Sequence, residues 1–380
     1  MLTEPSPVRV LLVAARYYPY MGGVETHVYE VGRRLVRAGA EVTVLTTDTS
    51  GQLPCFEESE GMQIRRVHAW PTNKDYYFAP GIYRTITRGR WDLVHCQGYH
   101  NLVPPLAMLA ARRAGIPYVL SFHSGGDVTR LRTALRRVQW TMLRPLLLQA
   151  GKLIAVSEFE ANFFRERLQL PSERFVVIPN GSAHLPEVPQ PAEATTRGAN
   201  NSPLIVSIGR LVRYKGHQRL IAALPKVLEQ VPDARVRIVG VGPYESTLRQ
   251  LARRLGVADR VEIRPVPPGD RKGLALLIAR ANLVTLLSEH EAQGLAAMEA
   301  LTLGRPVLVA GTSALQELAE RGLARSVPLE SSPEEVATAV VSQLRQPIVP
   351  QNVVLPTWDT CATGLLALYQ TIVRRISCAS

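Results

Sequence analysis

Short apolar runs in the first half of the chain alternate with longer stretches of helical periodicity. Residues 8–14 form the first run, and an amphipathic helix is predicted over about residues 25–38. Further buried strands are predicted at residues 41–47, 63–67, 93–96, 118–122, 153–156 and 175–178. Alternating strands and helices are typical of a parallel sheet covered by helices on both faces.

The pattern breaks at residues 185–203, a stretch rich in Pro, Ala, Thr and Asn, which we interpret as an interdomain linker. Alternation then resumes, with strands predicted at residues 204–208, 236–239, 261–263, 283–287 and 307–309 and a last helix at 358–376. We therefore expect two doubly wound, Rossmann-like α/β domains facing across a cleft, over residues 1–184 and 204–356. Ligands of such sheets bind outside the carboxyl ends of the strands.

Composition and charge narrow the function classes. The chain has 380 residues, 46% of them hydrophobic, which suits two domains that each bury a core. A net charge of +12 favours an anionic partner, such as nucleotide phosphate, anionic lipid or nucleic acid. No helix-turn-helix, zinc-finger or RNA-binding aromatic motif supports nucleic acid. The four scattered cysteines, and the lack of a signal peptide or an apolar run of membrane-spanning length, lead us to expect a cytoplasmic location.

A basic stretch in the first domain is a candidate membrane contact. Arg132, Arg136 and Arg137 lie near Trp140, and this composition could meet anionic lipid headgroups at the inner face of the plasma membrane. The alternative is a domain helix with a solvated basic face.

Two glutamates eight residues apart, Glu291 and Glu299, follow the predicted strand 283–287. Gly294 is expected to open the helix that carries Glu299, so free amides would face an anion while carboxylates accept hydrogen bonds from sugar hydroxyls. Ordinary acids on a solvated helix face are the alternative.

Cations and glycines follow two other strands of the second domain. Arg210 and Lys215 lie in the loop after residues 204–208 and could neutralise a diphosphate, although an exposed basic loop has the same pattern. Gly240 and Gly242 could let the backbone approach a ligand, or could simply form a tight turn. They do not complete GxGxxG, since Glu245 occupies the last position.

The first domain offers two candidates. Gly22 and Gly23 lie between a strand and a helix, where an anion-binding nest or a plain turn would fit. His123 ends a predicted strand and precedes two glycines and Asp127, so it could bond a sugar hydroxyl or be a packed core histidine.

These motifs together resemble the family 4 retaining glycosyltransferases, which have the GT-B fold. The resemblance covers nearly the whole chain. It rests on GGVETH, HSGGD, AVSEFE, IPNG, SIGRLVRYKG and GVGP, followed by the pair Glu291/Glu299, in this order.

For the second domain, the resemblance implies that Arg210 and Lys215 bind the donor diphosphate, that Glu299 holds the ribose and that Glu291 contacts the donor sugar. The backbone at Gly294 and Leu295 would cradle phosphate. Gln293, Gly240 and Gly242 complete the set of candidate donor-binding residues.

For the first domain, the resemblance implies that His123 lies beside the transferring sugar and that Gly22, Gly23 and Asp127 belong to an acceptor and phosphate loop. The last helix, assigned to residues 357–377, would cross back onto this domain.

The implied function is metal-independent transfer, with retention, of a hexose-type sugar from a nucleotide diphosphate-sugar, with UDP expected more than GDP. The nucleotide-sugar would be a co-substrate, and no further cofactor is expected. The acceptor would be a glycan, a lipid-linked sugar or a small molecule, in polysaccharide or glycolipid synthesis of the cell envelope. The alternatives are a GT-B epimerase or phosphorylase, a nicotinamide-dependent oxidoreductase, or a non-catalytic binder of anions or membrane surfaces.

Three departures from the family pattern bear on the donor sugar. Ala292 and Gln293 follow the first glutamate, where a small residue and an aromatic are usual. Thr312, Ser313 and Ala314 replace a usual glycine pair, and Ser182 with an alanine follows IPNG.

Overall fold

The structure, a computed structural model, describes residues 7–20, 22–71, 77–124, 130–182, 185, 202–267, 269–351 and 353–377. The chain divides into two compact units. Unit 1 comprises Met1–Gly181 and Pro356–Ser380, and unit 2 comprises Ser182–Leu355. Most of the predicted linker 185–203 lies outside the described residues.

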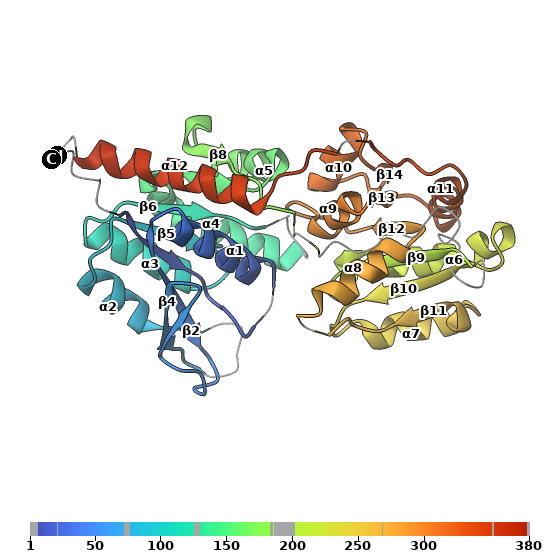
Figure 1. The fold of residues 1–380 in the computed structure, drawn as a ribbon, viewed down its shortest axis with the longest axis horizontal. Coiled ribbons are helices and arrows are strands. Elements are labelled where there is room, and N and C mark those ends of the chain that lie inside the picture. Colours follow the sequence, from blue (N-terminus) through green and yellow to red (C-terminus); the bar gives the residue numbers. More distant parts are fainter. Residues whose placement is uncertain are drawn as a thin grey trace. The chain divides into compact units, whose positions relative to one another are not determined.

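Unit 1 contains an eight-stranded sheet in the order β3-β4-β2-β1-β5-β6-β7-β8 (Figure 1). All neighbouring strands are parallel except β3 and β4, which form an antiparallel hairpin at one edge. The strands are β1 (Arg9–Val13), β2 (Glu41–Asp48), β3 (Phe56–Ser59), β4 (Met62–His68), β5 (Leu93–Gln97), β6 (Tyr118–Ser121), β7 (Leu153–Ala155) and β8 (Phe175–Val177).

Helices cover both faces of this sheet, so its central strands are buried on both sides. Leu11 and Val13 face a core shared with α2 (Pro80–Arg88), α3 (Val103–Arg113), α4 (Arg130–Gln149) and α5 (Glu158–Leu168). Val10 and Leu12 face a second core shared with α1 (Gly23–Arg37) and α12 (Trp358–Ser377). Consecutive residues of β1 thus face opposite sides of the sheet, as expected from the two-residue period of a strand.

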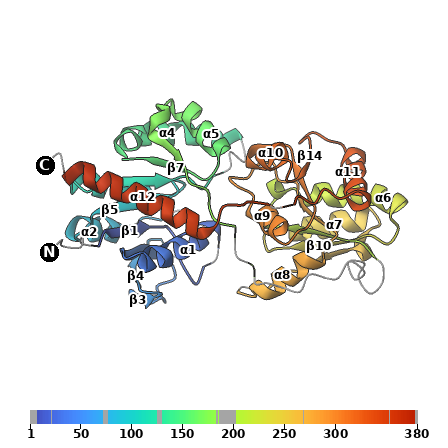
Figure 2. The same cartoon turned by 45° about the horizontal axis from the view of Figure 1, so that its top comes forward.

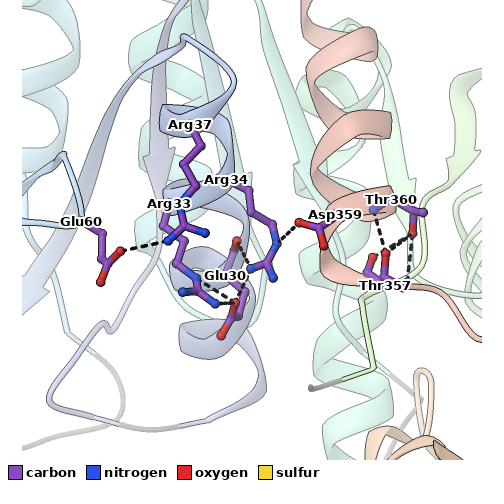
Figure 3. Close-up of polar contacts among 8 residues, drawn as sticks. All are labelled: Glu30, Arg33, Arg34, Arg37, Glu60, Thr357, Asp359 and Thr360. Atoms are coloured by element: carbon purple, nitrogen blue, oxygen red, sulfur yellow. Dashed lines mark hydrogen bonds and ion pairs between the residues drawn. The ribbon is translucent and has the colours of Figure 1, made fainter. Parts of the chain in front are cut away.

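The last helix, α12, belongs to unit 1 and lies alongside α1, as Figures 1 and 2 show. Arg34 of α1 joins the two helices, since its Nε donates to Asp359 at 2.7 Å and its Nη1 pairs with Glu30 (Figure 3). Trp358 is buried in the core beneath them. The expectation that the last helix returns to the first domain is therefore confirmed.

Unit 2 contains a six-stranded, fully parallel sheet in the order β11-β10-β9-β12-β13-β14. Its strands are β9 (Leu204–Ile208), β10 (Arg235–Val239), β11 (Val261–Ile263), β12 (Leu283–Leu286), β13 (Val307–Ala310) and β14 (Arg325–Val327). One face packs on α6 (His217–Gln230), α7 (Glu245–Arg254) and α11 (Pro333–Arg345). The other packs on α8 (Arg271–Arg280), α9 (Leu295–Thr302) and α10 (Ser313–Glu320).

The predicted α/β architecture of two doubly wound sheets is confirmed, but two strands were missed. β3 has mostly exposed residues and β14 has the sequence RSV, with two polar residues, so neither carries an apolar run that would predict a strand.

The direction in which strands are added reverses once in each sheet. In unit 2 the chain moves from β9 outward through β10 and β11, then returns to add β12 on the other side of β9. In unit 1 the same reversal separates β1 from β5. Ligands of doubly wound sheets bind at the carboxyl ends of strands at such a reversal.

The candidate membrane contact is wrong at its aromatic residue, Trp140. Trp140 exposes 5% of its surface and packs in the unit 1 core among Tyr99, Phe163 and Phe164. A side chain that fills a core cannot also enter a lipid interface. The side chains of Arg132, Arg136 and Arg137 lie outside the described residues. Within the described part of the chain, no helix is long and apolar enough to cross a membrane.

Candidate functional site

The loops after β9 and β12 meet at the strand reversal of unit 2. Lys215, at the end of a 3-10 turn over Arg213–Lys215, places its Nζ 2.6 Å from Oε1 of Glu291. The contact requires close backbone packing, because a Cβ on Gly216 would lie 1.9 Å from the carbonyl oxygen of Leu287. A predicted cation and a predicted carboxylate, 76 residues apart, thus form one ion pair.

Two serine hydroxyls contact Glu291, one at its carboxylate and one at its backbone amide. Ser288 donates to Oε1 of Glu291 at 2.8 Å, and the Glu291 amide donates to Oγ of Ser313 at 2.9 Å. Ser313 has φ of +53°, a conformation that glycine adopts more easily. The residue that departs from the usual glycine pair therefore keeps a glycine-like backbone and adds a hydroxyl beside Glu291.

Arg210 lies at the exposed side of the same loop and donates to the hydroxyl of Tyr214 at 2.5 Å. The Tyr214 ring stacks on His290, with ring centroids 4.7 Å apart. The stack joins the loop after β9 to the loop after β12, and it was not predicted.

Gly294 precedes α9 with φ of +74°, so the predicted helix start is correct. Leu295 is the first residue of α9, and Gln293 beside it is 9% exposed. Glu299, further along α9, accepts a hydrogen bond from Nη2 of Arg271 at 2.9 Å. Burial raises the pKa of Glu299 above its usual value, and the Arg271 guanidinium limits this rise.

Gly240 and Gly242 have a structural explanation. A Cβ on Gly240 would lie 1.9 Å from the carbonyl oxygen of Gly209, and one on Gly242 would lie 2.4 Å from that of Leu211. These glycines let the loop after β10 pack directly on the loop that carries Arg210, so they shape the site through its backbone.

In unit 1, Gly22 is the N-cap of α1 and Gly23 is its first residue. The carboxylate of Glu25 lies over this terminus, since a Cβ on Gly22 would meet its Oε2 at 2.5 Å. An anion bound at this helix end would therefore have to share it with the chain's own carboxylate.

Three motifs of unit 1 meet around one histidine. Nδ1 of His27, from GGVETH, shares a 2.6 Å hydrogen bond with Oδ1 of Asn180, from IPNG. The His27 ring also packs against His123, from HSGGD, with centroids 4.6 Å apart. Nε2 of His123 contacts Oε1 of Gln97 at 2.7 Å.

Burial keeps these imidazoles neutral. It lowers the pKa of His27 to about 4 and holds that of His123 well below its usual value, with nearby histidines adding to the shift for His123. A neutral His123 can exchange hydrogen bonds with hydroxyls but does not supply a positive charge.

Glu160, from AVSEFE, fastens the loop that carries His123. Its carboxylate accepts the amides of Ser124 at 2.5 Å and Val156 at 2.8 Å. The predicted loop residue Asp127 lies outside the described residues. No group of three His, Cys, Asp or Glu side chains that could hold a metal occurs among the residues that the structure describes.

Comparisons with known proteins agree with this arrangement. Residues 21–182 match the model of Glycosyltransferase Family 4, and residues 192–354 match that of Glycosyl transferases group 1. The GDP-mannose:cellobiosyl-diphosphopolyprenol alpha-mannosyltransferase of Xanthomonas oryzae pv. oryzae is 30% identical over 78% of this chain and 77% of its own. The chain belongs to glycosyltransferase family 4.

A second relative of this glycosyltransferase is the D-inositol 3-phosphate glycosyltransferase of Nocardiopsis dassonvillei, which is 29% identical over 92% of this chain and 89% of its own.

Solved structures show the GT-B fold. Sucrose-phosphate synthase from Thermosynechococcus elongatus has a TM-score of 0.73 at 21% identity, covering 98% of this chain and all of its own. HepE from Anabaena, solved in complex with UDP and glucose, has a TM-score of 0.71 at 19% identity, covering 97% and 98%.

The structure thus brings together most of the predicted donor residues of this glycosyltransferase within unit 2, and His123 with the GGVETH motif within unit 1. It adds Ser288, Ser313 and Arg271, which were not predicted to contact the two glutamates. Ser313 had a signal in the sequence, because it departs from the family pattern beside Ala314. Arg271 had none, since it precedes Glu299 by 28 residues on another helix.

Proposed function

We propose that this glycosyltransferase transfers a hexose-type sugar from a nucleoside diphosphate-sugar to an acceptor hydroxyl, with retention and without a metal. The observation that carries the proposal is the paired arrangement at the strand reversal of unit 2, where Lys215 contacts Glu291 and Glu299 lies on the adjoining helix. Cation, carboxylates and helix amides together suit a diphosphate linked to two sugars.

In this proposal Glu299 accepts hydrogen bonds from the ribose diol. Lys215 and Arg210 neutralise the diphosphate as its bond to the sugar breaks, and the amides at Gly294 and Leu295 face the same anion. Because charge builds on the leaving diphosphate, these groups stabilise the transition state more than the bound donor.

The donor sugar is placed against Glu291 and Gln293. The acceptor attacks the face from which the diphosphate departs, and a diphosphate oxygen takes the acceptor proton. His123, neutral and partly buried, offers a hydrogen bond to a sugar hydroxyl.

UDP is the proposed nucleotide, with GDP as the alternative. HepE was solved with UDP and with UDP-glucose, whereas the Xanthomonas relative is named for GDP-mannose. The names of the relatives also include a phosphorylated inositol and a lipid-linked diphosphate, so a phosphate-bearing acceptor of cell-envelope synthesis fits this enzyme.

The test is a thermal-shift and donor-hydrolysis screen of the full chain against UDP- and GDP-sugars, with magnesium and with EDTA. One nucleotide should raise the melting temperature equally in both conditions, and Glu299→Ala should abolish the shift. Glu320→Ala, which removes an exposed carboxylate from α10, is the matched control and should retain it. A shift that persists in Glu299→Ala would refute the ribose assignment, and a requirement for magnesium would refute the metal-free mechanism.

A further inference from the structure

Arg271 is the first residue of α8, and its side chain points to a carboxylate on another helix. Nη2 of Arg271 donates to Oε1 of Glu299 at 2.9 Å, where Glu299 exposes 10% of its side chain and Arg271 exposes 42%. Asp270 caps the same helix by accepting the amide of Gly273 at 2.7 Å. The first turn of α8 is therefore fixed by its own cap, and the Arg271 side chain extends from it to the Glu299 carboxylate.

Within the described ranges, no other charged group lowers the pKa of Glu299. The strands packed against α9 are β12 and β13, whose residues LVTL and VLVA carry no ionisable side chain. The acids of α10, Glu317 and Glu320, do not contribute to the pKa of Glu299. Lys272, the neighbour of Arg271, is exposed and does not contribute either. Among the described residues, the Arg271 guanidinium alone opposes the effect of burial on this carboxyl group.

The pair leaves part of the carboxylate available. Oε1 of Glu299 accepts from Arg271, whereas Oε2 makes no hydrogen bond to any residue that the structure describes. An ionised carboxylate accepts hydrogen bonds at both oxygens, but a protonated one must donate at one of them. A vicinal diol that offers its hydroxyl protons is therefore bound best by the ionised form.

We propose that Arg271 is a positioning residue for nucleotide binding, which holds the Glu299 carboxylate ionised and oriented toward the ribose diol. This inference rests on the proposed function, in which Glu299 contacts the ribose. It adds that the nucleotide affinity of this enzyme depends on a second ionisable group that touches Glu299 from α8.

The experiment measures the Kd of UDP, or of GDP if only GDP binds, by titration calorimetry from about pH 6 to about pH 9. Arg271→Gln should weaken binding about ten- to hundredfold near neutral pH, as expected when a charged hydrogen-bond partner is lost. Affinity should recover as the pH rises, because the Glu299 carboxyl then ionises without help. Arg271→Lys should stay within about threefold of the wild type, since one hydrogen bond and one charge suffice at this contact.

Lys272→Gln is the matched control, because it removes a positive charge one residue away without touching Glu299, and its affinity should equal that of the wild type. Loss of affinity in Arg271→Gln that is the same at every pH would overturn the proposal, as would unchanged affinity. If Arg271→Gln does not fold, Arg271→Lys decides, and a tenfold or larger loss in that variant counts against the proposal.

Glu299→Gln separates this inference from the proposed function. It should weaken binding at every pH, since an amide cannot ionise. If Glu299→Gln binds like the wild type, the ribose assignment itself fails. If it binds weakly while Arg271→Gln binds normally, only the role of Arg271 fails.

Discussion

The ion pair between Lys215 and Glu291 is expected to stabilise the empty enzyme as well as to serve the donor. Lys215→Met keeps most of the aliphatic stem but removes the ammonium group, so the Glu291 carboxylate is left with the Ser288 hydroxyl as its side-chain donor. Glu291→Gln removes the opposite charge and leaves Lys215 without its partner.

The magnitude follows from distance and burial. Two unit charges 2.6 Å apart attract by about 6 kcal/mol at an effective dielectric constant of about 20. The Lys215 and Glu291 side chains expose only 18% and 15% of their surface, so the cost of removing water from both charges offsets much of this attraction. A net coupling free energy of about 2 kcal/mol remains, in the range of hydrogen bonds between charged groups.

A double-mutant cycle measures this coupling from urea unfolding of the wild type, Lys215→Met, Glu291→Gln and the double variant. The matched control is the pair Lys226–Glu229, at 2.9 Å but with side chains 48% and 61% exposed. Its coupling should be close to zero because water screens it. A coupling at Lys215–Glu291 no larger than that of the control would refute the reasoning.

The same pair makes a counterintuitive prediction for ligand binding. In the empty enzyme Glu291 neutralises Lys215, so a diphosphate competes with a carboxylate for the ammonium group. Glu291→Gln should therefore tighten the binding of the free nucleoside diphosphate at low ionic strength while it lowers sugar transfer. Parallel losses of nucleotide binding and of transfer in this variant would contradict the competition.

Two further predictions concern unit 1 and the buried histidines. Gly181→Ala should destabilise the fold by about 2 kcal/mol or more in urea unfolding, because the added Cβ would lie 2.1 Å from the amide nitrogen of Trp358. The control Gly364→Ala in α12 places its new Cβ 3.6 Å from Ile178 and should be neutral or stabilising by up to about 1 kcal/mol. Equal losses of stability in both variants would count against the packing argument. The free energy of unfolding should also fall as the pH drops from about 6.5 toward about 4. Four histidines have lowered pKa values in the fold, namely His27, His95, His123 and His217, so they bind protons in the unfolded chain but not in the folded one. Glu160, with its pKa raised to about 8, and Glu299, with its pKa also raised, act in the opposite direction with one proton each. Because two protons do not offset four, a urea midpoint that is no lower near pH 5 than near pH 7 would contradict the neutral assignment.

The sequence by itself determined the local elements and the fold class. Apolar runs predicted the central strands of both sheets to within a few residues, because a strand buried on both faces must be almost continuously apolar. The start of α9 at Gly294 was also predictable, because glycine readily adopts the positive φ that this helix start has. The edge strand β3 escaped prediction for the same physical reason, since an exposed strand leaves no apolar signature.

Only the tertiary structure decided which distant residues touch. Strand order brings Lys215 to Glu291, whereas the packing of helices and loops brings His27 to Asn180 and Arg271 to Glu299. Periodicity records whether a side chain is buried, but not which side chain from another element it meets. Trp140 illustrates this limit. An aromatic residue close to arginines is typical of a membrane contact, but packing places this tryptophan in the core.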